Sequence, residues 1–222
     1  LVDLWGFGSQ FGVVNPPERS EVELLLETIG HDKLRRDSAN QSVMKTSTLQ
    51  LDFSSIAKGY AVDQIAEWFN KQLIDDFLVE VGGEVRLSGY SARGDAWRIA
   101  IEQPDGSGRV AQALALTDTA MATSGDYRNY FEFKGKRFSH SLDPHTGFPV
   151  EHDLVSVTVL HPSAAMADGW ATALTVLGSK EAIEVAQEQG LAVYFIRRDG
   201  EGFISSYSEA FSPYLQMSED GA

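Results

Sequence analysis

The chain has 222 residues, of which 43% are hydrophobic and 10% aromatic, a composition typical of a globular protein with a sizeable core. Its formal net charge of −14 argues strongly against a nucleic-acid-binding surface, and a phosphorylated substrate would need a divalent cation, a lysine or a helix N-terminus as counter-charge. The absence of cysteine excludes disulfides, thiolate metal sites and a cysteine nucleophile.

The chain opens with LVDLWGFGSQFGVVNPPE, which has no initiator methionine, no basic segment and no signal-peptide pattern. We therefore expect an N-terminal portion of a longer protein to precede it. No apolar run approaches the roughly 20 residues that a membrane-spanning helix needs, so we expect none in this chain.

The first half of the chain predicts two helices and three strands. Ser20 and Glu23 fit a capping box, and a first helix is expected to continue to Ile29, before Gly30. Alternating residues predict a strand over 47–53. A helix over 54–73 follows, with Ser54 or Ser55 as its cap. Its apolar stripe comprises Ile56, Tyr60, Ala61, Ile65, Trp68 and Phe69. Two short strands are expected on either side of Gly82 and Gly83.

The second half predicts two hairpins, two strands and two helices. The hairpins cover 96–117 and 130–142, and residues 122–131 include a small-residue turn before the second. Strands are expected over 154–160 and 191–196, and helices over 163–178 and 179–189. We predict an α+β fold, a largely antiparallel or mixed sheet packed with helices, forming a single domain over residues 1–222.

The stretch LDFSSIAKGYAVD (51–63) is the first candidate for a functional site. Amide groups at the start of a helix, together with Lys58, can bind phosphate, and Gly59 allows close approach of a ligand or another chain segment. An ordinary capped helix with a surface lysine explains the same residues, because the Walker spacing is absent.

The stretch ADGWATAL (167–174) is the second candidate. Asp168 and Thr172 are four residues apart in a predicted helix and share a face. Carboxylate and hydroxyl oxygens suit Mg²⁺, which also favours phosphate oxygens. The alternative is that Asp168 lies on a solvated face and that Thr172 bonds back to the helix backbone.

The stretch FSHSLDPHTGFPV (138–150) is the third candidate. His140 follows alternating residues and precedes a turn built on Asp143, Pro144 and Gly147, where His145 is expected to be exposed. His140 is a candidate general base, although a lone histidine is more often structural. Together, the three stretches indicate a metal–phosphate site with a histidine for proton transfer.

Six motifs stand out along the chain, namely LVDLWGFG, LDFSSIAKGYAVDQIA, LVEVGGEVRLSG, WRIAIEQP, ATSGDYRNYFEFKGKRFSHSLDPHTGFPV and ADGWATALTVLG. With these motifs, in this order, the chain resembles the ApbE family of flavin transferases from residue 1 to about 205. The resemblance implies a Mg²⁺-dependent enzyme that cleaves FAD and attaches FMN by a phosphoester to a threonine or serine of a target protein, releasing AMP. It implies as acceptors the membrane subunits of sodium-pumping NADH:quinone oxidoreductase and Rnf-type complexes.

The resemblance also implies roles for individual residues. Asp168, Thr172 and the backbone carbonyl of Ser55 match the family's metal ligands. Three further residues match positions that contact FAD, namely Asp52, Lys58 and Leu142. His140 matches the histidine proposed to deprotonate the acceptor hydroxyl, which a histidine near its ordinary pKa can do around neutral pH.

Two departures from the family pattern bear on these expectations. Some members carry a second aspartate before the metal-binding threonine, where this chain has Ala171, so water is expected to replace one ligand. The family's flavin-ring contacts lie upstream of LVDLWGFG.

Two alternative functions are an FAD pyrophosphatase that passes FMN to water and a flavin-binding protein without turnover. Family members are commonly periplasmic and anchored by a lipidated cysteine near the N-terminus, a location that rests on the resemblance.

Overall fold

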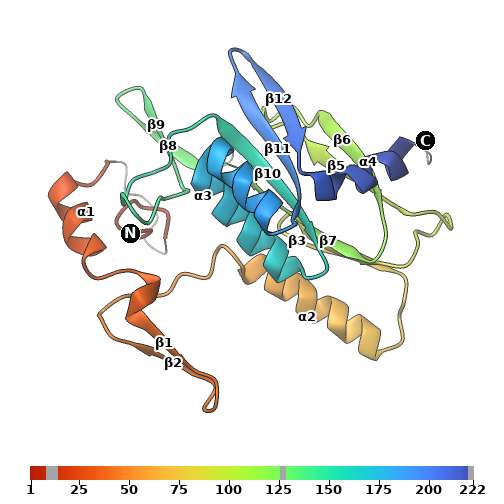
Figure 1. Ribbon diagram of the computed structural model, residues 1–222, viewed down its shortest axis with the longest axis horizontal. Helices are drawn as coiled ribbons and strands as arrows, with labels where there is room; N and C mark the ends of the chain where they lie inside the picture. Colours follow the sequence, from red (N-terminus) through yellow and green to blue (C-terminus); the bar gives the residue numbers. More distant parts are fainter. Residues whose placement is uncertain (9–14, 126–128, 220–222) are drawn as a thin grey trace. The chain divides into compact units, whose positions relative to one another are not determined.

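The structure is a computed structural model that describes residues 1–8, 15–125 and 129–219. The chain divides into two compact units (Figure 1). The first unit comprises Leu1–Asp52 and Asn129–Glu151, and the second comprises Phe53–Arg128 and His152–Ala222.

The first unit contains α1 (Arg19–Leu26), a 3₁₀ turn η1 (His31–Lys33) and two hairpins, whose strands pair antiparallel. The hairpins are β1 (Leu34–Asp37) with β2 (Ser42–Lys45), and β8 (Tyr130–Phe133) with β9 (Lys136–Ser139). The prediction of a strand over 47–53 is wrong, because no strand covers these residues. The capping box of α1 is formed by Glu18 and Glu21 rather than by Ser20 and Glu23.

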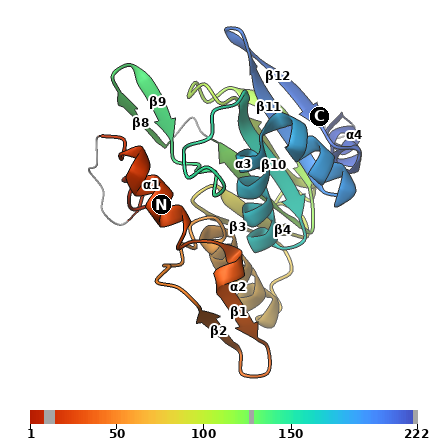
Figure 2. The same cartoon turned by 60° about the vertical axis from the view of Figure 1, so that its left-hand side comes forward.

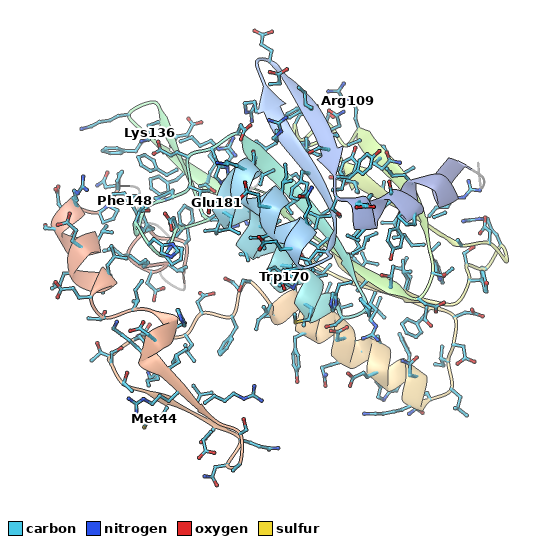
Figure 3. All side chains as sticks on the ribbon, in the orientation of Figure 1. Met44, Arg109, Lys136, Phe148, Trp170 and Glu181 are labelled. Atoms are coloured by element: carbon cyan, nitrogen blue, oxygen red, sulfur yellow. The ribbon has the colours of Figure 1, made fainter. Side chains whose placement is uncertain are left out.

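Trp5 is the buried centre of the first unit. Its indole Nε1–H donates to the carbonyl of Gly147 at 2.8 Å. Its ring lies 5.7 Å from the ring of Phe138 and 5.6 Å from that of Phe148, which Figure 3 labels. Gly147 has φ +77°, and a Cβ there would lie 2.4 Å from Val22 Cγ1 on α1. The opening residues, α1 and the 143–147 turn are therefore packed together in one unit.

The second unit is built on a six-stranded antiparallel sheet, in the order β12-β11-β10-β7-β4-β3. These strands span Phe77–Val81 (β3), Glu84–Ser88 (β4), Thr119–Gly125 (β7), Leu154–His161 (β10), Ala192–Asp199 (β11) and Gly202–Tyr207 (β12). A separate hairpin pairs β5 (Trp97–Glu102) with β6 (Val110–Leu116). The helices are α2 (Ala57–Lys71), α3 (Ala164–Glu188) and α4 (Ser212–Glu219), with the 3₁₀ turn η2 (Glu209–Phe211) before α4.

The two faces of this sheet are buried by different elements. Val193 and Phe195 on β11 pack with α3, while Tyr194 and Ile196, which alternate with them, pack with β5, β6 and Phe211. α2 packs beside α3, over β3. Figures 1 and 2 both show α3 lying along β10. The predicted α+β class, with an antiparallel sheet packed with helices, is confirmed.

Strand β7 corrects another prediction. Residues 122–125, expected in a turn, lie at the end of this central strand, and residues 126–128 of the same expected turn are outside the described residues. Ala122 on this strand is fully buried against α3, which packs closely on it, whereas its neighbour Met121 is buried on the other face of the sheet. Small residues on a central strand were mistaken for turn chemistry.

Helix α3 has a break at Gly178, where φ is +76° and ψ is 171°. The two predicted helices, 163–178 and 179–189, are therefore its two segments. His152 covers the end of the first segment: its Nε2 lies 2.7 Å from the carbonyl of Thr175, so Nε2 carries the proton. In the described part of the chain, no helix is both long and apolar enough to cross a membrane.

Candidate metal and phosphate site

The start of α2 brings together Lys58 and backbone groups of residues 55–59 in the second unit. The N-cap is Ile56, with no side-chain cap, so the prediction that Ser54 or Ser55 caps the helix is wrong. The amide of Gly59 donates to Asp168 Oδ2 at 3.0 Å instead of to the carbonyl of Ser55. Among the described residues, the Ser55 carbonyl has no backbone hydrogen bond, and it is therefore available as an oxygen ligand.

Gly59 is required for the contact between α2 and α3. A Cβ at this position would lie 2.2 Å from the carbonyl oxygen of Ala164 and 2.8 Å from the Cα of Ala165. Both distances are far below van der Waals contact, so only glycine allows the two helices this close. This close approach brings the first turn of α2 to the carboxylate of Asp168.

Asp63 fixes the two helices in this arrangement from inside α2. Its carboxylate accepts from the Ser163 hydroxyl at 2.7 Å, from the amides of Ala164 and Ala165 at 2.9 and 3.0 Å, and from Arg86 Nη1 at 2.6 Å. Burial alone would raise the pKa of Asp63, but the bonds from Ala165, Ser163, Ala164 and Arg86 outweigh it and hold the pKa below its ordinary value. Asp63 thus acts as an N-cap for α3 supplied by another helix.

Asp168 lies in the first turns of α3, the helix that also carries the labelled Trp170 in Figure 3. Its side chain is only 4% exposed, so the alternative of a solvated face is wrong. Burial raises the pKa of Asp168 above its ordinary value, against the opposing effects of the Gly59 hydrogen bond and the charge of Lys58. The negative charge is therefore not fully compensated by the residues around it.

Thr172 lies one helical turn after Asp168, on the same face, and is half-buried. In the described residues its hydroxyl makes no hydrogen bond back to the helix, unlike Thr175, whose hydroxyl donates to the Ala171 carbonyl at 2.8 Å. Ala171 itself is buried in the core between α3 and the sheet. The Thr172 hydroxyl is thus available beside Asp168.

Lys58 and Glu84 form an ion pair next to this carboxylate. Lys58 Nζ lies 2.6 Å from Glu84 Oε2. The lysine side chain is 43% exposed, whereas that of Glu84 is 2% exposed. Burial raises the pKa of Glu84, the hydrogen bond and charge of Lys58 oppose this, and the charge of Asp168 adds to the rise. Lys58, Glu84 and Asp168 therefore influence one another electrostatically.

These residues fit a divalent cation. A buried, undercompensated carboxylate, a hydroxyl one turn away and a backbone carbonyl are the hard oxygen ligands that Mg²⁺ takes, with water completing its shell. Within the described ranges, no group of three or more histidine, aspartate or glutamate side chains could hold a metal, so such a site depends on neutral oxygens as well.

The first unit contains the remaining predicted site residues. His140 follows β9 directly, and its Nδ1 lies 3.0 Å from the carbonyl of Asn129. Leu142 forms an isolated bridge with Pro149. Asp52 is exposed and lies outside any strand. The structure therefore gathers Ser55, Lys58, Asp168 and Thr172 in the second unit, and Asp52, His140 and Leu142 in the first.

The turn after His140 is tightly hydrogen-bonded. Asp143 Oδ1 accepts from the amide of His145 at 2.8 Å, and the amide of Gly147 donates to the carbonyl of Asp143 at 2.8 Å. His145 is exposed, as predicted. Burial raises the pKa of Asp143, but its hydrogen bonds from His145 and Thr146 prevail and lower it.

Sequence reasoning missed Glu84 and Asp63. Each had a signal. Glu84 directly follows Gly82 and Gly83 and shares a face of its strand with Arg86, and Asp63 lies on the helix face with Gly59, Val62 and Ala66. A charged residue at a buried position of a strand or helix requires a partner.

Comparison with known proteins identifies the family. The model of the ApbE family matches residues 1–195. The chain is 41% identical over 224 residues to the FAD:protein FMN transferase of Haemophilus influenzae, covering 99% of this chain and 65% of that protein. It is 40% identical to the FAD:protein FMN transferase of Escherichia coli K12, covering 97% of this chain and 62% of the relative.

Solved structures agree with this assignment. The apo flavinyl transferase ApbE of Pseudomonas stutzeri matches with a TM-score of 0.86 and 40% identity, over 96% of this chain and 66% of that one. The flavin transferase ApbE of Vibrio cholerae matches with a TM-score of 0.87 and 38% identity, over 96% and 68%. The chain thus spans somewhat under two thirds of its sequence relatives, and it belongs to the ApbE family.

Proposed function

We propose that the protein to which this chain belongs is a Mg²⁺-dependent FAD:protein FMN transferase, which joins FMN by a phosphoester to a threonine or serine of a target protein and releases AMP. The relatives' names supply the reaction. The observation that carries the proposal is the cluster at the start of α2, where the buried Asp168 accepts from Gly59 beside Lys58.

Asp168, Thr172 and the Ser55 carbonyl would hold the cation. When bound, Mg²⁺ neutralises the charge of the FAD diphosphate and polarises its phosphorus–oxygen bonds. Lys58 is suited to bind the diphosphate oxygens, because it extends from the first turn of α2, and Gly59 allows the backbone to approach. We assign Asp52 and Leu142 to further contacts with FAD, as in the family.

In the transfer step, the acceptor hydroxyl oxygen forms a bond to the phosphorus of the FMN half. The bond from this phosphorus to the bridging oxygen breaks, and AMP leaves with the electron pair. We assign His140 as the base that takes the hydroxyl proton. Since the Asn129 carbonyl can only accept, His140 Nδ1 carries a proton, and Nε2 is the basic nitrogen of the neutral ring.

The acceptor and the location belong to the proposal as well. Subunits of sodium-pumping NADH:quinone oxidoreductase or Rnf-type complexes are the proposed acceptors, and the periplasmic side of the inner membrane, with a lipoprotein anchor on the complete protein, is the proposed location. Both follow from the family resemblance.

The test is mass spectrometry of an acceptor polypeptide after incubation of the full-length protein with FAD and Mg²⁺. A gain of one FMN, lost in an Asp168→Asn variant, is expected. Free FMN and AMP without modified acceptor would indicate hydrolysis, and FAD recovered intact would indicate a flavin-binding protein without turnover. The His140→Ala variant is expected to lose transfer while its affinity for FAD stays within about twofold, since a base acts in the chemical step.

A further inference from the structure

Glu84 is a buried carboxylate for which the reaction described above has no role. It is the first residue of β4, directly after the two-residue turn of Gly82 and Gly83, and is 1% exposed. Its side chain is only 2% exposed, and its strand pairs with β3 at Val81. A buried ion pair is often no more stabilising than apolar side chains of the same size, so stability alone is a weak reason for its presence.

Glu84 determines where the Lys58 ammonium lies. The Nζ–Oε2 distance is 2.6 Å, and the stem of Lys58 passes over the turn, since a Cβ at Gly82 would lie 3.1 Å from Lys58 Cδ. The lysine is therefore held on both its apolar and its charged part by the β3–β4 hairpin.

The charges of this cluster do not cancel. Glu84 and Asp168 are two carboxylates against the single ammonium of Lys58, and each carboxylate is affected by the same lysine. The cluster formed by these three residues therefore carries one net negative charge. Such a cluster attracts a divalent cation and repels a diphosphate.

We propose that Glu84 is the counter-ion that makes this cluster bind the divalent cation first and the diphosphate second. Glu84 holds Lys58 in place and cancels the charge of Lys58 until the cation is bound. The inference rests on the proposed function of the same site. Without Glu84, the cluster would be neutral, the cation would bind less tightly, and Lys58 would attract the diphosphate without help.

Glu84→Gln tests this, because it removes the charge and keeps the size and a hydrogen-bond acceptor. Two equilibrium constants are measured on the full-length protein: Mn²⁺ binding without FAD, by electron paramagnetic resonance, and FAD binding in EDTA, by flavin fluorescence. One charge several ångströms away, at an effective dielectric constant near 20, predicts changes of about tenfold or more. Mn²⁺ affinity is expected to fall, and FAD affinity in EDTA is expected to rise.

The opposite signs distinguish an electrostatic role from a structural one, since a damaged site would weaken both constants. The inference is overturned unless Glu84→Gln lowers the affinity for Mn²⁺ and raises the affinity for FAD in EDTA. Glu80→Gln is the matched control: Glu80 is exposed on the same hairpin, accepts from the Gly83 amide at 2.8 Å, and should change neither constant by more than about twofold. If Glu84→Gln does not fold, Lys58→Met must give the reverse pattern, with tighter Mn²⁺ and weaker FAD binding in EDTA.

The proposed function is tested separately by Asp168→Asn. If this variant binds Mn²⁺ as tightly as the unmodified protein, the metal site itself is wrong. If Asp168→Asn loses Mn²⁺ while Glu84→Gln changes neither constant, only the role of Glu84 is refuted.

Discussion

Gly59→Ala should separate α2 from α3 and weaken the metal site in one step. The added methyl carbon would lie 2.2 Å from the carbonyl oxygen of Ala164, against a contact distance of about 3.2 Å or more, so the helices must move apart by about 1 Å. The bond from the Gly59 amide to Asp168, now 3.0 Å, would then be stretched to about 4 Å and lost.

The magnitude follows from these two effects. Overpacking of a tight contact costs about 1–3 kcal/mol, and the lost hydrogen bond to a buried carboxylate adds about 1.5–3 kcal/mol. For a chain of this size, each kcal/mol lowers the midpoint of thermal unfolding by about 2–4 °C, so the combined cost of about 2.5–6 kcal/mol predicts a fall of about 5–24 °C. Calorimetry gives the midpoint, and a Mn²⁺ titration should show weaker binding.

Gly202→Ala is the control for Gly59→Ala. The nearest atom to a Cβ at Gly202 is the Asp199 carbonyl oxygen at 3.6 Å, an ordinary contact, so the midpoint should change by less than about 2 °C. If Gly59→Ala unfolds within 2 °C of the unmodified protein and binds Mn²⁺ as tightly, the helix contact does not position Asp168.

Three further predictions concern acidity, metal binding and the first unit. The folded-state pKa of Asp63 is lowered, so its stabilisation is complete above the ordinary carboxyl pKa of about 4 and is lost as the pH falls through the lower folded value. The free energy of unfolding in urea should therefore differ most between Asp63→Asn and the unmodified protein near neutral pH, by about 3 kcal/mol, and the same difference at all pH values would contradict this. The pKa of Asp168 is raised, and a carboxylate must be deprotonated to bind a metal, so the affinity for Mn²⁺ should fall as the pH drops through that raised value. An affinity that does not change with pH in isothermal titrations would refute Asp168 as a ligand. Trp5→Phe leaves the Gly147 carbonyl without its donor and should destabilise the protein by about 1–3 kcal/mol in urea unfolding, whereas no change would show that the indole hydrogen bond is dispensable.

The elements with strong local signals could be predicted from the sequence. The β3–β4 and β5–β6 hairpins could be predicted because each has a glycine-containing turn between two apolar strands. The break in α3 lies at Gly178, where the first of two helices was predicted to end. The β1–β2 hairpin was missed because its strands, LRRD and SVMK, are exposed along almost their whole length and show no apolar alternation. Strand β12 was missed for a related reason, since it lies at the edge of the sheet and is mostly exposed.

Helix α2 shows why the site could be predicted only in part. Its buried side is formed by Gly59, Val62, Asp63 and Ala66, while Tyr60 and Trp68 of the apolar stripe are 58% and 56% exposed. Because α2 packs tightly, its buried side consists of small residues instead of large apolar ones. A search for hydrophobic periodicity does not detect such a side. Asp168 and Thr172 could be paired from their spacing within one helix. Glu84 and Asp63 reach the site through long-range packing, to which local spacing gives no access.

The proposed function requires a divalent ion bound to the Asp168 carboxylate, the Thr172 hydroxyl and the Ser55 carbonyl, with His140 as the base. A crystal structure of the full-length protein with FAD and Mn²⁺, with an anomalous difference map at the manganese edge, tests it directly. We expect the strongest peak within coordination distance of the Asp168 carboxylate, the Thr172 hydroxyl and the Ser55 carbonyl, with the diphosphate on the ion and His140 facing the phosphorus. A manganese peak elsewhere, or His140 on the opposite side of the molecule from Asp168, would contradict the proposed function.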